Sequence, residues 1–376
     1  MKTPRVAIVH DWLTGMRGGE KVVEALCELF PDATLFTLVH VPGSVSPTIE
    51  RLPIVTSFIQ RLPLAAKHYR HYLPLFPTAV ERFDLSAFDL VLSSSHAVAK
   101  GARTKPGTLH ICYCHTPMRY IWDLYDEYFG EGRSRWPTRL GMRAFVGSLR
   151  RWDLRTAKNP HYYVTNSQNV RERIRRLYNR DAEVIHAPID ASFFQPSPVN
   201  GDYFLIVSAF VPYKRIDLAI EAFNETGQRL IIIGDGPEDA RLRSMAKPNI
   251  QFLGWQPNDQ LKKYYAECKA VIFPGAEDFG LVPLEAMASG RPVIAYAKGG
   301  ALETVFDTPS KRTGILFPEQ TVASLLAALE RFRPGDFSSK ELRNHALQFD
   351  KELFKTKMRA YLLEKWDCFV GAHRQQ

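Results

Sequence analysis

Residues 269–296 have the sequence KAVIFPGAEDFGLVPLEAMASGRPVIAY, in which a strand, a turn, a helix and a second strand follow one another. After Lys269, the residues AVIF are apolar without polar alternation, and we therefore expect a buried parallel strand over 269–273. Pro283 stands where the first turn of a helix tolerates proline best. The amides of Gly280, Leu281 and Val282 would therefore open at the end of a strand, where a helix N-terminus binds anions such as phosphate.

Two glutamates, Glu277 and Glu285, bracket the glycine turn, with Phe279 between them. Glu285 lies one turn into the predicted helix, where a carboxylate can accept hydrogen bonds from a ribose diol. Glu277, on the loop, can do the same for sugar hydroxyls. The residues alone leave a second interpretation open, in which Glu285 complements the helix dipole, worth about 0.3–1 kcal/mol, and Glu277 is a solvated loop charge.

Apolar strand-like runs alternate with helical patterns along the whole chain, which favours parallel sheets joined by crossover helices. The stretch QPSPVNG at 195–201 breaks this alternation and is predicted to link two domains. We therefore expect an α/β fold with two Rossmann-like, doubly wound domains, an N-terminal one over 1–195 and a C-terminal one over 200–350.

Two cations follow the first strand of the second predicted domain, in SAFVPYKRIDLAIEAF. Lys214 stands at the turn into a helix, from which an ammonium can reach phosphates held at the glycine turn. Arg215 is its neighbour, and an arginine fork is a good bidentate phosphate ligand. The alternative is a pair of surface cations in a first helical turn.

Glycines and a histidine follow strands of the first predicted domain. Gly18 and Gly19 precede an amphipathic helix and can let the backbone approach a phosphate or a sugar, although tight packing alone also explains such glycines. His115 stands at the end of a strand, and strand ends face the ligand crevice in doubly wound folds. A structural role is the ordinary expectation for a lone histidine.

Composition limits the class of protein. The chain has 376 residues, 45% of them hydrophobic, which is enough for two cores of ordinary size. Its five cysteines show no paired CxxC spacing, and this favours thiols in a reducing compartment. No run approaches the roughly 18–20 apolar residues of a membrane-spanning helix, and the N-terminus lacks the apolar run of a signal peptide. We expect a cytoplasmic protein.

The net charge of +9 is concentrated in one region. Between Arg133 and Arg176, eleven arginines and Lys158 oppose only Asp153 and Glu172. Within it, 133–157 mixes arginines with apolar residues and predicts a basic amphipathic helix on an anionic membrane surface. A solvated helix with a core-facing stripe is the alternative. Nucleic acid is disfavoured as a partner because no binding module accompanies the patch.

The glutamate pair and its flanks resemble the donor-site signature of the retaining glycosyltransferases of family 4, which have the GT-B fold. The resemblance is strong over 203–305 and recurs in the N-terminal half, in HDWL, GGEKV, SSSHAVAKG and CHTPMRYIWD. It implies two domains facing each other across a cleft. It also implies that the last helix, from about 355 to 376, returns to the first domain.

The resemblance also assigns roles to residues. It implies His115, Lys214 and Glu277 as the catalytic set, with His115 hydrogen-bonded to the transferred sugar rather than acting as a strong base. Gly18 and Gly19 would face the donor. Family members carry an arginine five residues before the lysine, but here that position is Ala209, and Arg215 is the expected substitute. The expected acceptor-side residues follow two strands, and they are Asp11, Trp12, Arg119, Tyr120, Trp122 and Asp123.

A metal is not expected. No D-x-D triplet, which holds a divalent cation in glycosyltransferases of the other common fold, occurs in the chain. Helix amides and Lys214 would stabilise the departing diphosphate instead. The expected enzyme uses no cofactor, and the nucleotide sugar is its substrate.

The motif combination looks like bacterial mannosyltransferases of O-antigen or exopolysaccharide assembly. It implies transfer of mannose from GDP-mannose to a lipid-linked saccharide, at the inner face of the cell membrane. Three alternatives stay open: a UDP-sugar transferase of the same fold, a sugar-nucleotide epimerase, and a non-catalytic carbohydrate- or membrane-binding protein.

Overall fold

The computed structural model describes residues 4–123, 125 and 136–373. Its contacts divide the chain into two compact units. Unit 1 comprises Met1–Ala187 and Phe354–Gln376, and unit 2 comprises Pro188–Leu353.

The stretch at 195–201, expected to join the domains, lies inside unit 2. The guanidinium of Arg291 donates hydrogen bonds to the backbone carbonyls of Ser197 (3.3 Å) and Val199 (2.7 Å), and to the side chain of Asn200 (2.6 Å). The stretch lies outside regular structure, between β7 and β8, and this arginine holds it on unit 2. The chain therefore changes unit earlier than the composition indicates, between Ala187 and Pro188.

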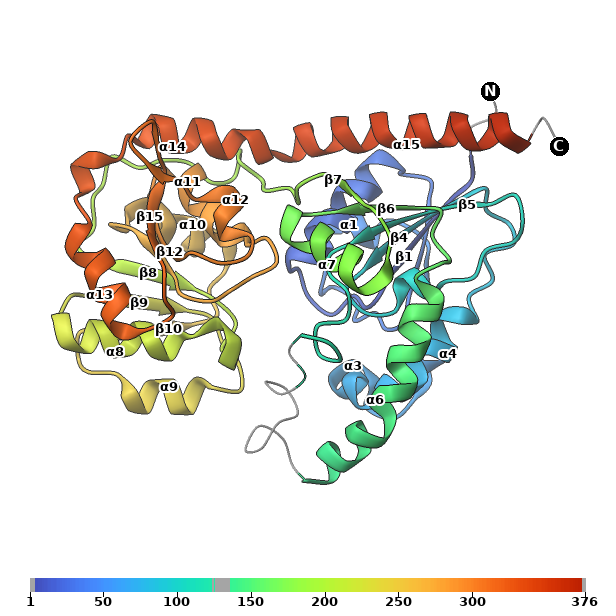
Figure 1. Ribbon diagram of the computed structural model, residues 1–376, viewed down its shortest axis with the longest axis horizontal. Coiled ribbons are helices and arrows are strands. Elements are labelled where there is room, and N and C mark those ends of the chain that lie inside the picture. Colours follow the sequence, from blue (N-terminus) through green and yellow to red (C-terminus); the bar gives the residue numbers. More distant parts are fainter. Residues whose placement is uncertain (1–3, 124, 126–135, 374–376) are drawn as a thin grey trace. The chain divides into compact units, whose positions relative to one another are not determined.

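Unit 1 is built on a seven-stranded sheet with the order β3-β2-β1-β4-β5-β6-β7, parallel throughout (Figure 1). Its central strands β1, β4 and β5 are wholly buried, as is typical of parallel strands covered on both faces. The strands are β1 (Val6–His10), β2 (Thr34–Thr37), β3 (Ile54–Thr56), β4 (Leu90–Ser95), β5 (Leu109–Cys114), β6 (Tyr162–Thr165) and β7 (Glu183–Val184).

Helices connect these strands. α1 begins with the glycine pair and buries Val22, Val23 and Leu26, the stripe that its sequence predicts. The Ser167 hydroxyl caps the start of α7, and Asn179 ends that helix in the left-handed conformation. The α-helices assigned to unit 1 are α1 (Gly18–Leu29), α2 (Pro47–Glu50), α3 (Ala65–His68), α4 (Phe76–Glu81), α6 (Trp136–Thr156) and α7 (Gln168–Tyr178). The 3-10 helices are η1 (Phe58–Arg61), η2 (Tyr69–Leu75) and η3 (Ala99–Gly101).

Unit 2 contains a parallel six-stranded sheet with the order β10-β9-β8-β11-β12-β15 and a small antiparallel hairpin, β13-β14. The strands are β8 (Phe204–Val207), β9 (Leu230–Ile233), β10 (Ile250–Gly254), β11 (Val271–Phe273), β12 (Val293–Tyr296), β13 (Asp307–Thr308), β14 (Lys311–Arg312) and β15 (Gly314–Phe317). The α-helices are α8 (Ile216–Thr226), α9 (Asp239–Met245), α10 (Asn258–Glu267), α11 (Leu281–Ala288), α12 (Ala301–Thr304), α13 (Val322–Arg331) and α14 (Ser339–Ala346). The 3-10 helices are η4 (Pro212–Lys214), η5 (Pro334–Asp336) and η6 (Leu347–Phe349).

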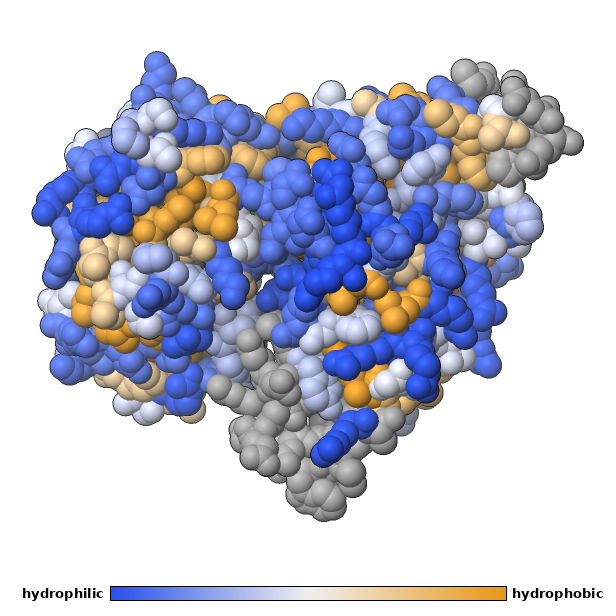
Figure 2. Space-filling model, in the orientation of Figure 1, coloured by the Kyte–Doolittle hydropathy of each residue, from blue (hydrophilic) through white to orange (hydrophobic). Residues whose placement is uncertain are grey.

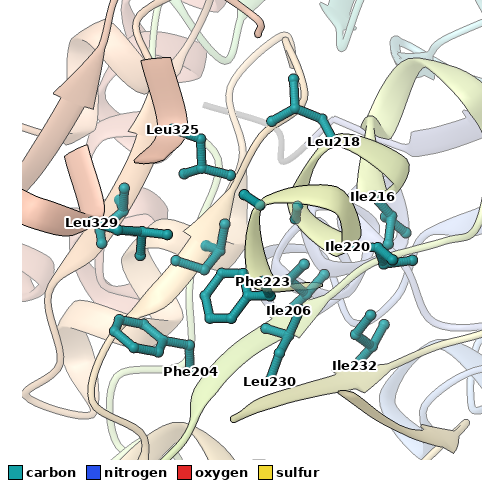
Figure 3. Packing of buried hydrophobic residues seen from close by; sticks show 14 of the residues in the cluster. Phe204, Ile206, Ile216, Leu218, Ile220, Phe223, Leu230, Ile232, Leu325 and Leu329 are labelled. Carbon is teal, nitrogen blue, oxygen red and sulfur yellow. The ribbon is translucent and has the colours of Figure 1, made fainter. Parts of the chain in front are cut away.

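The core of unit 2 lies between its sheet and helices α8 and α13 (Figure 3). Phe204 and Ile206 of the sheet pack with Phe223 of α8 and Leu325 of α13, and all four are buried. The two phenyl rings lie 5.2 Å apart between centroids, nearly edge to face. This packing holds the sheet rigid and so fixes the loops at the ends of its strands.

The predicted fold class, with two doubly wound parallel sheets, is confirmed. The last helix, α15 (Lys351–His373), begins in unit 2, and its residues from Phe354 belong to unit 1. None of the described helices is both long and apolar enough to cross a membrane. Hydrophilic side chains cover most of the face in Figure 2, with smaller hydrophobic patches between them.

Candidate active site

In both units the predicted site residues lie at the point where the strand order reverses. In unit 2, β8 lies between β9 and β11, and Lys214 and Glu277 follow β8 and β11. In unit 1, β1 lies between β2 and β4, and Asp11 follows β1 directly. Open parallel sheets bind ligands outside the carboxyl ends of their strands at such a point. Each unit therefore presents a candidate half-site, and we describe the two separately.

The unit 2 half-site brings Lys214 and Glu277 together. The ammonium of Lys214 forms an ion pair with the Glu277 carboxylate, and both side chains are largely shielded from solvent. Gly275 makes this approach possible, because a Cβ there would lie 2.9 Å from the Cα of Lys214 and 3.0 Å from the carbonyl oxygen of Tyr213. The backbone of Glu277 is held in turn by a hydrogen bond from the amide of Gly300 (2.9 Å).

Helix α11 begins at the glycine turn, as the sequence predicts. Its N-cap, Gly280, has φ +84°, and a Cβ there would lie 2.8 Å from the ring of Phe273. Only glycine fits this position without strain. Since the N-cap has no side chain, it places no capping oxygen over the first amides of the helix, Leu281 and Val282, which are half-buried.

Glu285 is buried on α11 and accepts a hydrogen bond from the hydroxyl of Tyr265 (2.8 Å). Burial, and then the charge of Glu285, raises the pKa of the Tyr265 phenol well above its ordinary value, so it stays a donor. Tyr265 belongs to α10 and is fully buried. Its position in the sequence resembles that of any core aromatic, and the sequence analysis did not identify it.

The structure also places Phe279 and Arg215, the two other side chains predicted on the donor side of unit 2. The side chain of Phe279 is buried, with its ring 5.9 Å from that of Phe349, so a contact with a ligand would come through its backbone. Arg215 caps α8 with φ +52°, and its guanidinium lies 3.3 Å from the carboxylate of Asp217 on the same helix. The role of Arg215 as the second phosphate cation stays a prediction.

The unit 1 half-site is centred on a chain of hydrogen bonds that the sequence analysis only partly anticipated. His10 Nδ1 lies 3.0 Å from the carbonyl oxygen of Ser94 and 3.1 Å from its hydroxyl. That hydroxyl lies 2.8 Å from Nε2 of His115. On the other side, His10 Nε2 lies 3.7 Å from the carboxylate of Glu20.

One proton position follows from these contacts. A carbonyl oxygen can only accept, so Nδ1 of His10 carries a hydrogen. The Ser94 hydroxyl donates to Nε2 of His115 or accepts from it, depending on the tautomer of His115. In the tautomer in which Nε2 accepts, neutral His115 holds its proton on Nδ1 and is a hydrogen-bond donor there. Burial, followed by the neighbouring histidines, lowers the pKa of His115 well below its ordinary value and keeps the ring neutral.

His10 differs from His115. Burial lowers the pKa of His10, but the hydrogen bond and charge of Glu20 outweigh it and raise the pKa above its ordinary value. Burial likewise raises the pKa of Glu20, and His10 reverses the shift to a net lowering. A Cβ on Gly19 would lie 3.5 Å from the ring of His10 and 3.7 Å from Nε2 of His115. Of the two predicted glycines, Gly19 thus borders the histidines, and Gly18 is the first residue of α1.

Asp11 is not an acceptor contact. It is fully buried, and its carboxylate accepts hydrogen bonds from the four backbone amides of residues 96–99, at 2.7–2.9 Å. The prediction was wrong because a strand end alone does not reveal that another loop covers it. Asp11 instead positions the loop that carries His96, whose ring lies 4.4 Å from that of half-buried Trp12.

Two of the predicted acceptor residues after β5 are held by other parts of unit 1. Asp123 pairs with Arg173 (2.7 Å) and Arg176 (2.8 Å) of α7. The indole of Trp122 donates to Asp153 of α6 (2.9 Å). These contacts hold both side chains in place, and the acceptor-side roles of Trp122 and Asp123 stay predictions.

The other two residues of that loop remain candidates for the acceptor side. Arg119 and Tyr120 are half-buried, and the Tyr120 hydroxyl lies 3.3 Å from the sulfur of Met118.

A buried charge cluster supports the same loops. The ammonium of Lys100 lies 2.8 Å from the carboxylate of Asp153 and 3.1 Å from the hydroxyl of Thr156. Trp122 and Tyr178 donate to the same carboxylate, each at 2.9 Å. Buried charges are stable only when paired and hydrogen-bonded in this way. The cluster ties α6 and α7 to the loop that Asp11 holds.

The basic segment at 133–157 largely corresponds to α6, and residues 133–135 lie outside the described chain. Two of its arginines are used internally: Arg150 donates to the carbonyl of Ile121 (2.6 Å), and Arg155 pairs with Glu81 (3.1 Å). Arg143 and Arg151 are exposed. Among the residues that the structure describes, no cluster of His, Cys, Asp or Glu could hold a metal ion.

Two family models match the chain. The model for glycosyl transferases group 1 covers residues 189–348, and the model for glycosyltransferase family 4 covers residues 16–193. Together they span 16–348.

Curated relatives match over shorter stretches. The chain is 30% identical over 151 residues to the O-antigen chain mannosyltransferase RfbU of Salmonella typhimurium, covering 37% of this chain and 43% of that protein. It is 38% identical over 123 residues to a GDP-mannose-dependent alpha-mannosyltransferase of Mycobacterium tuberculosis, covering 32% of each chain. In both cases the match spans less than half of the relative's length.

Solved structures match over nearly the whole chain. Sucrose-phosphate synthase from Thermosynechococcus elongatus superimposes with a TM-score of 0.72 at 18% identity, covering 97% of this chain and 100% of that one. Anabaena Alr3699/HepE in complex with UDP-glucose gives 0.70 at 18% identity, covering 96% and 99%. At this identity the likeness establishes the fold.

Proposed function

We propose that this chain, which belongs to glycosyltransferase family 4 and has the GT-B fold, transfers a hexose from a nucleoside diphosphate sugar to a saccharide acceptor, with retention of configuration. The observation that carries the proposal is the Lys214–Glu277 ion pair, at the strand-order reversal of unit 2 and on the loop that leads into α11. A cation, a carboxylate and a helix N-terminus are the groups that a sugar diphosphate requires.

In this proposal the ion pair changes partners when the donor binds. The diphosphate draws Lys214 away from Glu277 and also accepts hydrogen bonds from the first amides of α11. Glu277 is then free to accept from the hydroxyls of the sugar. Glu285, positioned by Tyr265, accepts from the ribose diol. The anomeric C–O bond to the diphosphate breaks as the acceptor oxygen bonds to the same carbon, and the departing diphosphate oxygen takes the acceptor's proton. Lys214 and the amides stabilise the charge of the departing diphosphate, with no metal in the proposed scheme.

Unit 1 contributes a neutral histidine. In the proposed scheme the Ser94 hydroxyl donates to Nε2 of His115. His115 then carries its proton on Nδ1, donates a hydrogen bond to an oxygen of the transferred sugar and takes no proton from the acceptor. Its lowered pKa favours this role, because an imidazole that resists protonation stays neutral throughout the pH range of most enzymes.

The proposed donor is GDP-mannose and the proposed acceptor is a lipid-linked saccharide of the cell surface, used at the inner face of the membrane. The mannosyltransferases among the relatives support this choice. A UDP-sugar is the second candidate, supported by the bound UDP-glucose in Alr3699/HepE. No residue of the half-sites separates guanine from uracil on physical grounds.

A nucleotide screen tests the proposal. Isothermal titration of the full chain with GDP, UDP and ADP, each with and without EDTA, should show one preferred nucleotide and no dependence on a metal. Lys214→Ala should weaken that binding. Lys247→Ala is the matched control. Lys247 precedes β10, the outermost strand of the same sheet, and so lies at the amino ends of the strands, whereas Lys214 lies beyond their carboxyl ends. Failure of every nucleotide to bind would revive a non-catalytic carbohydrate-binding role.

A further inference from the structure

A segment of unit 1 that the sequence analysis did not single out is strongly cationic. Residues 51–80 contain no aspartate or glutamate. Arg61, Lys67 and Arg70 are exposed and form no ion pair with any residue that the structure describes. The segment over 61–75, which includes α3 and η2, therefore presents unneutralised positive charge to its surroundings.

Leu64 of this segment combines an exposed apolar side chain with a left-handed backbone. Its side chain is 70% exposed, and its backbone is left-handed, with φ +52° and ψ +22°. A leucine is disfavoured in this conformation. Leu75 at the other end is also exposed. Clustered cations without ion-pair partners indicate an anionic partner, and the strained, exposed leucine among them offers that partner an apolar contact.

The inner side of the segment is firmly packed, which fixes the outward face. Ala65, Tyr69 and Phe76 are buried, and the hydroxyl of Tyr72 donates to the carbonyl of Pro63 (2.8 Å).

This packing leads directly to the unit 1 half-site. The ring of Tyr69 lies 5.1 Å from that of Trp12, which in turn contacts His96 at 4.4 Å. The segment therefore adjoins the loops around His115.

We infer that residues 61–75 form a docking surface for an anionic lipid bilayer. The cations lie at the level of the headgroups, and Leu64 enters the boundary with the acyl chains. Clustered cations beside isolated apolar side chains match the layered chemistry of a membrane interface. The inference rests on the proposed function, since a surface next to the sugar site would bring the enzyme to an acceptor held in the bilayer. The sequence predicted membrane contact through the basic helix α6 alone. In this inference residues 61–75 and α6 both contact the membrane.

The first test is a paired charge reversal in vesicle flotation. We expect the full chain to bind phosphatidylglycerol-containing vesicles, to ignore pure phosphatidylcholine, and to dissociate at high salt. Lys67→Glu with Arg70→Glu should weaken binding about 25-fold or more, at about fivefold for each cation lost. Lys262→Glu with Lys263→Glu makes the same charge change on α10 of unit 2 and should have little effect.

The second test separates docking from folding. Leu64→Gly removes the apolar side chain and relieves the left-handed backbone, because glycine adopts positive φ without penalty. Vesicle affinity should fall about 5- to 10-fold, while the thermal midpoint stays level or rises. Loss of binding in a protein of equal or greater stability cannot come from unfolding. Leu363→Ala, at an exposed leucine of α15, is the control and should bind normally.

Three outcomes would overturn the inference. Indifference of the wild type to anionic vesicles at low salt would leave the segment a solvated surface. Normal binding by the Lys67/Arg70 variant, with loss of binding in Arg143→Glu with Arg151→Glu, would assign docking to α6 alone. Displacement from vesicles by millimolar inorganic pyrophosphate would show a phosphate site instead. These assays contain no nucleotide, so absent donor binding in calorimetry would contradict the proposed function without affecting them.

Discussion

The two half-sites use different physical means to hold their functional groups. In unit 1, His115 is oriented by buried hydrogen bonds through Ser94 to His10, whose ring lies 3.7 Å from the Glu20 carboxylate. All of these groups are buried and in contact with one another, so the half-site is set before any ligand arrives. In unit 2, Lys214 is held by Glu277, and in the proposed mechanism this pair separates when a diphosphate binds.

This difference predicts different responses to change. When one residue of a preorganised hydrogen-bond network is replaced, the neighbouring side chain loses a hydrogen bond, and the effect on the reaction comes from its changed orientation. An ion pair that exchanges partners contributes charge directly to the reaction, and charge facing a leaving group is usually the larger contribution. We therefore expect substitutions in unit 2 to cost more in rate than those in unit 1.

The largest effect is expected for Lys214→Ala. Removing one preorganised cation from the departing diphosphate should lower turnover by about 10²–10³ at saturating donor. Initial-rate measurements against donor concentration separate this loss from weaker binding. Arg215→Ala should cost less, because its guanidinium already pairs with Asp217. Near-normal turnover of the Lys214 variant would contradict the proposed charge stabilisation.

Glu285→Ala comes next in expected size. A lost hydrogen bond to a charged group costs about 1.5–3 kcal/mol, so donor affinity should fall roughly 10- to 150-fold. Tyr265→Phe is the companion variant. It leaves the carboxylate in place without its tyrosine donor, and should weaken donor binding less than Glu285→Ala does. Calorimetry on folded variants gives both values, and an unchanged affinity in Glu285→Ala would remove the ribose assignment.

The sequence predicted what lies within a few residues of a motif. Both sheets follow from their apolar runs, such as LIII of β9. Lys214 and Glu277 could be named because each lies in the loop after a strand, and topology alone brings such strand ends together. Strand β3, by contrast, has only three residues, lies at a sheet edge and exposes Val55. Such a strand has too little apolar pattern to recognise.

What the sequence could not predict depends on contacts between distant segments. Asp11 was assigned to the acceptor, but the loop at 96–99, more than eighty residues later, encloses its carboxylate. Tyr265 reaches Glu285 from a different helix. Ser94 is one of three consecutive serines at the end of β4, and the sequence does not indicate which of them contacts His115. Periodicity gives the face of an element, not the partner that covers it.

Mild acid should destabilise unit 1 more than unit 2. Burial lowers the pKa of His110 to about 3 and that of His186 to about 4, both in unit 1. Both residues are neutral in either state above pH 6.5. Below pH 6.5 these histidines bind protons in the unfolded chain but stay neutral in the native chain. The free energy of unfolding therefore falls as the pH drops from 6.5 to the native pKa values. The slope is about 1.4 kcal/mol per pH unit for each proton.

Hydrogen exchange measured by unit at pH 7 and pH 5 tests this expectation. His10, whose pKa is raised, acts in the opposite direction and offsets part of the loss. Unit 2 contains one histidine with a lowered pKa, His345, and should change less. His186→Gln should reduce the acid sensitivity of unit 1. Equal acid sensitivity in both units would contradict the assignment to these histidines.

The smallest effect, and the sharpest test of the unit 1 half-site, is expected for Ser94→Ala. One neutral hydrogen bond is lost, which costs about 0.5–1.5 kcal/mol, so turnover should fall about 2- to 10-fold. The decisive readout is the ring nitrogens of His115 in ¹⁵N-labelled protein. In the wild type Nδ1 should carry the proton, and in the variant the proton should divide between both nitrogens. Ser93→Ala is the matched control, because Ser93 on the same strand lies 2.8 Å from Nε2 of His110 instead. That variant should shift the signals of His110 and leave those of His115 unchanged. If Ser94→Ala also leaves the His115 signals unchanged, the hydrogen-bond chain does not set its proton, and the contrast between the two half-sites loses its basis.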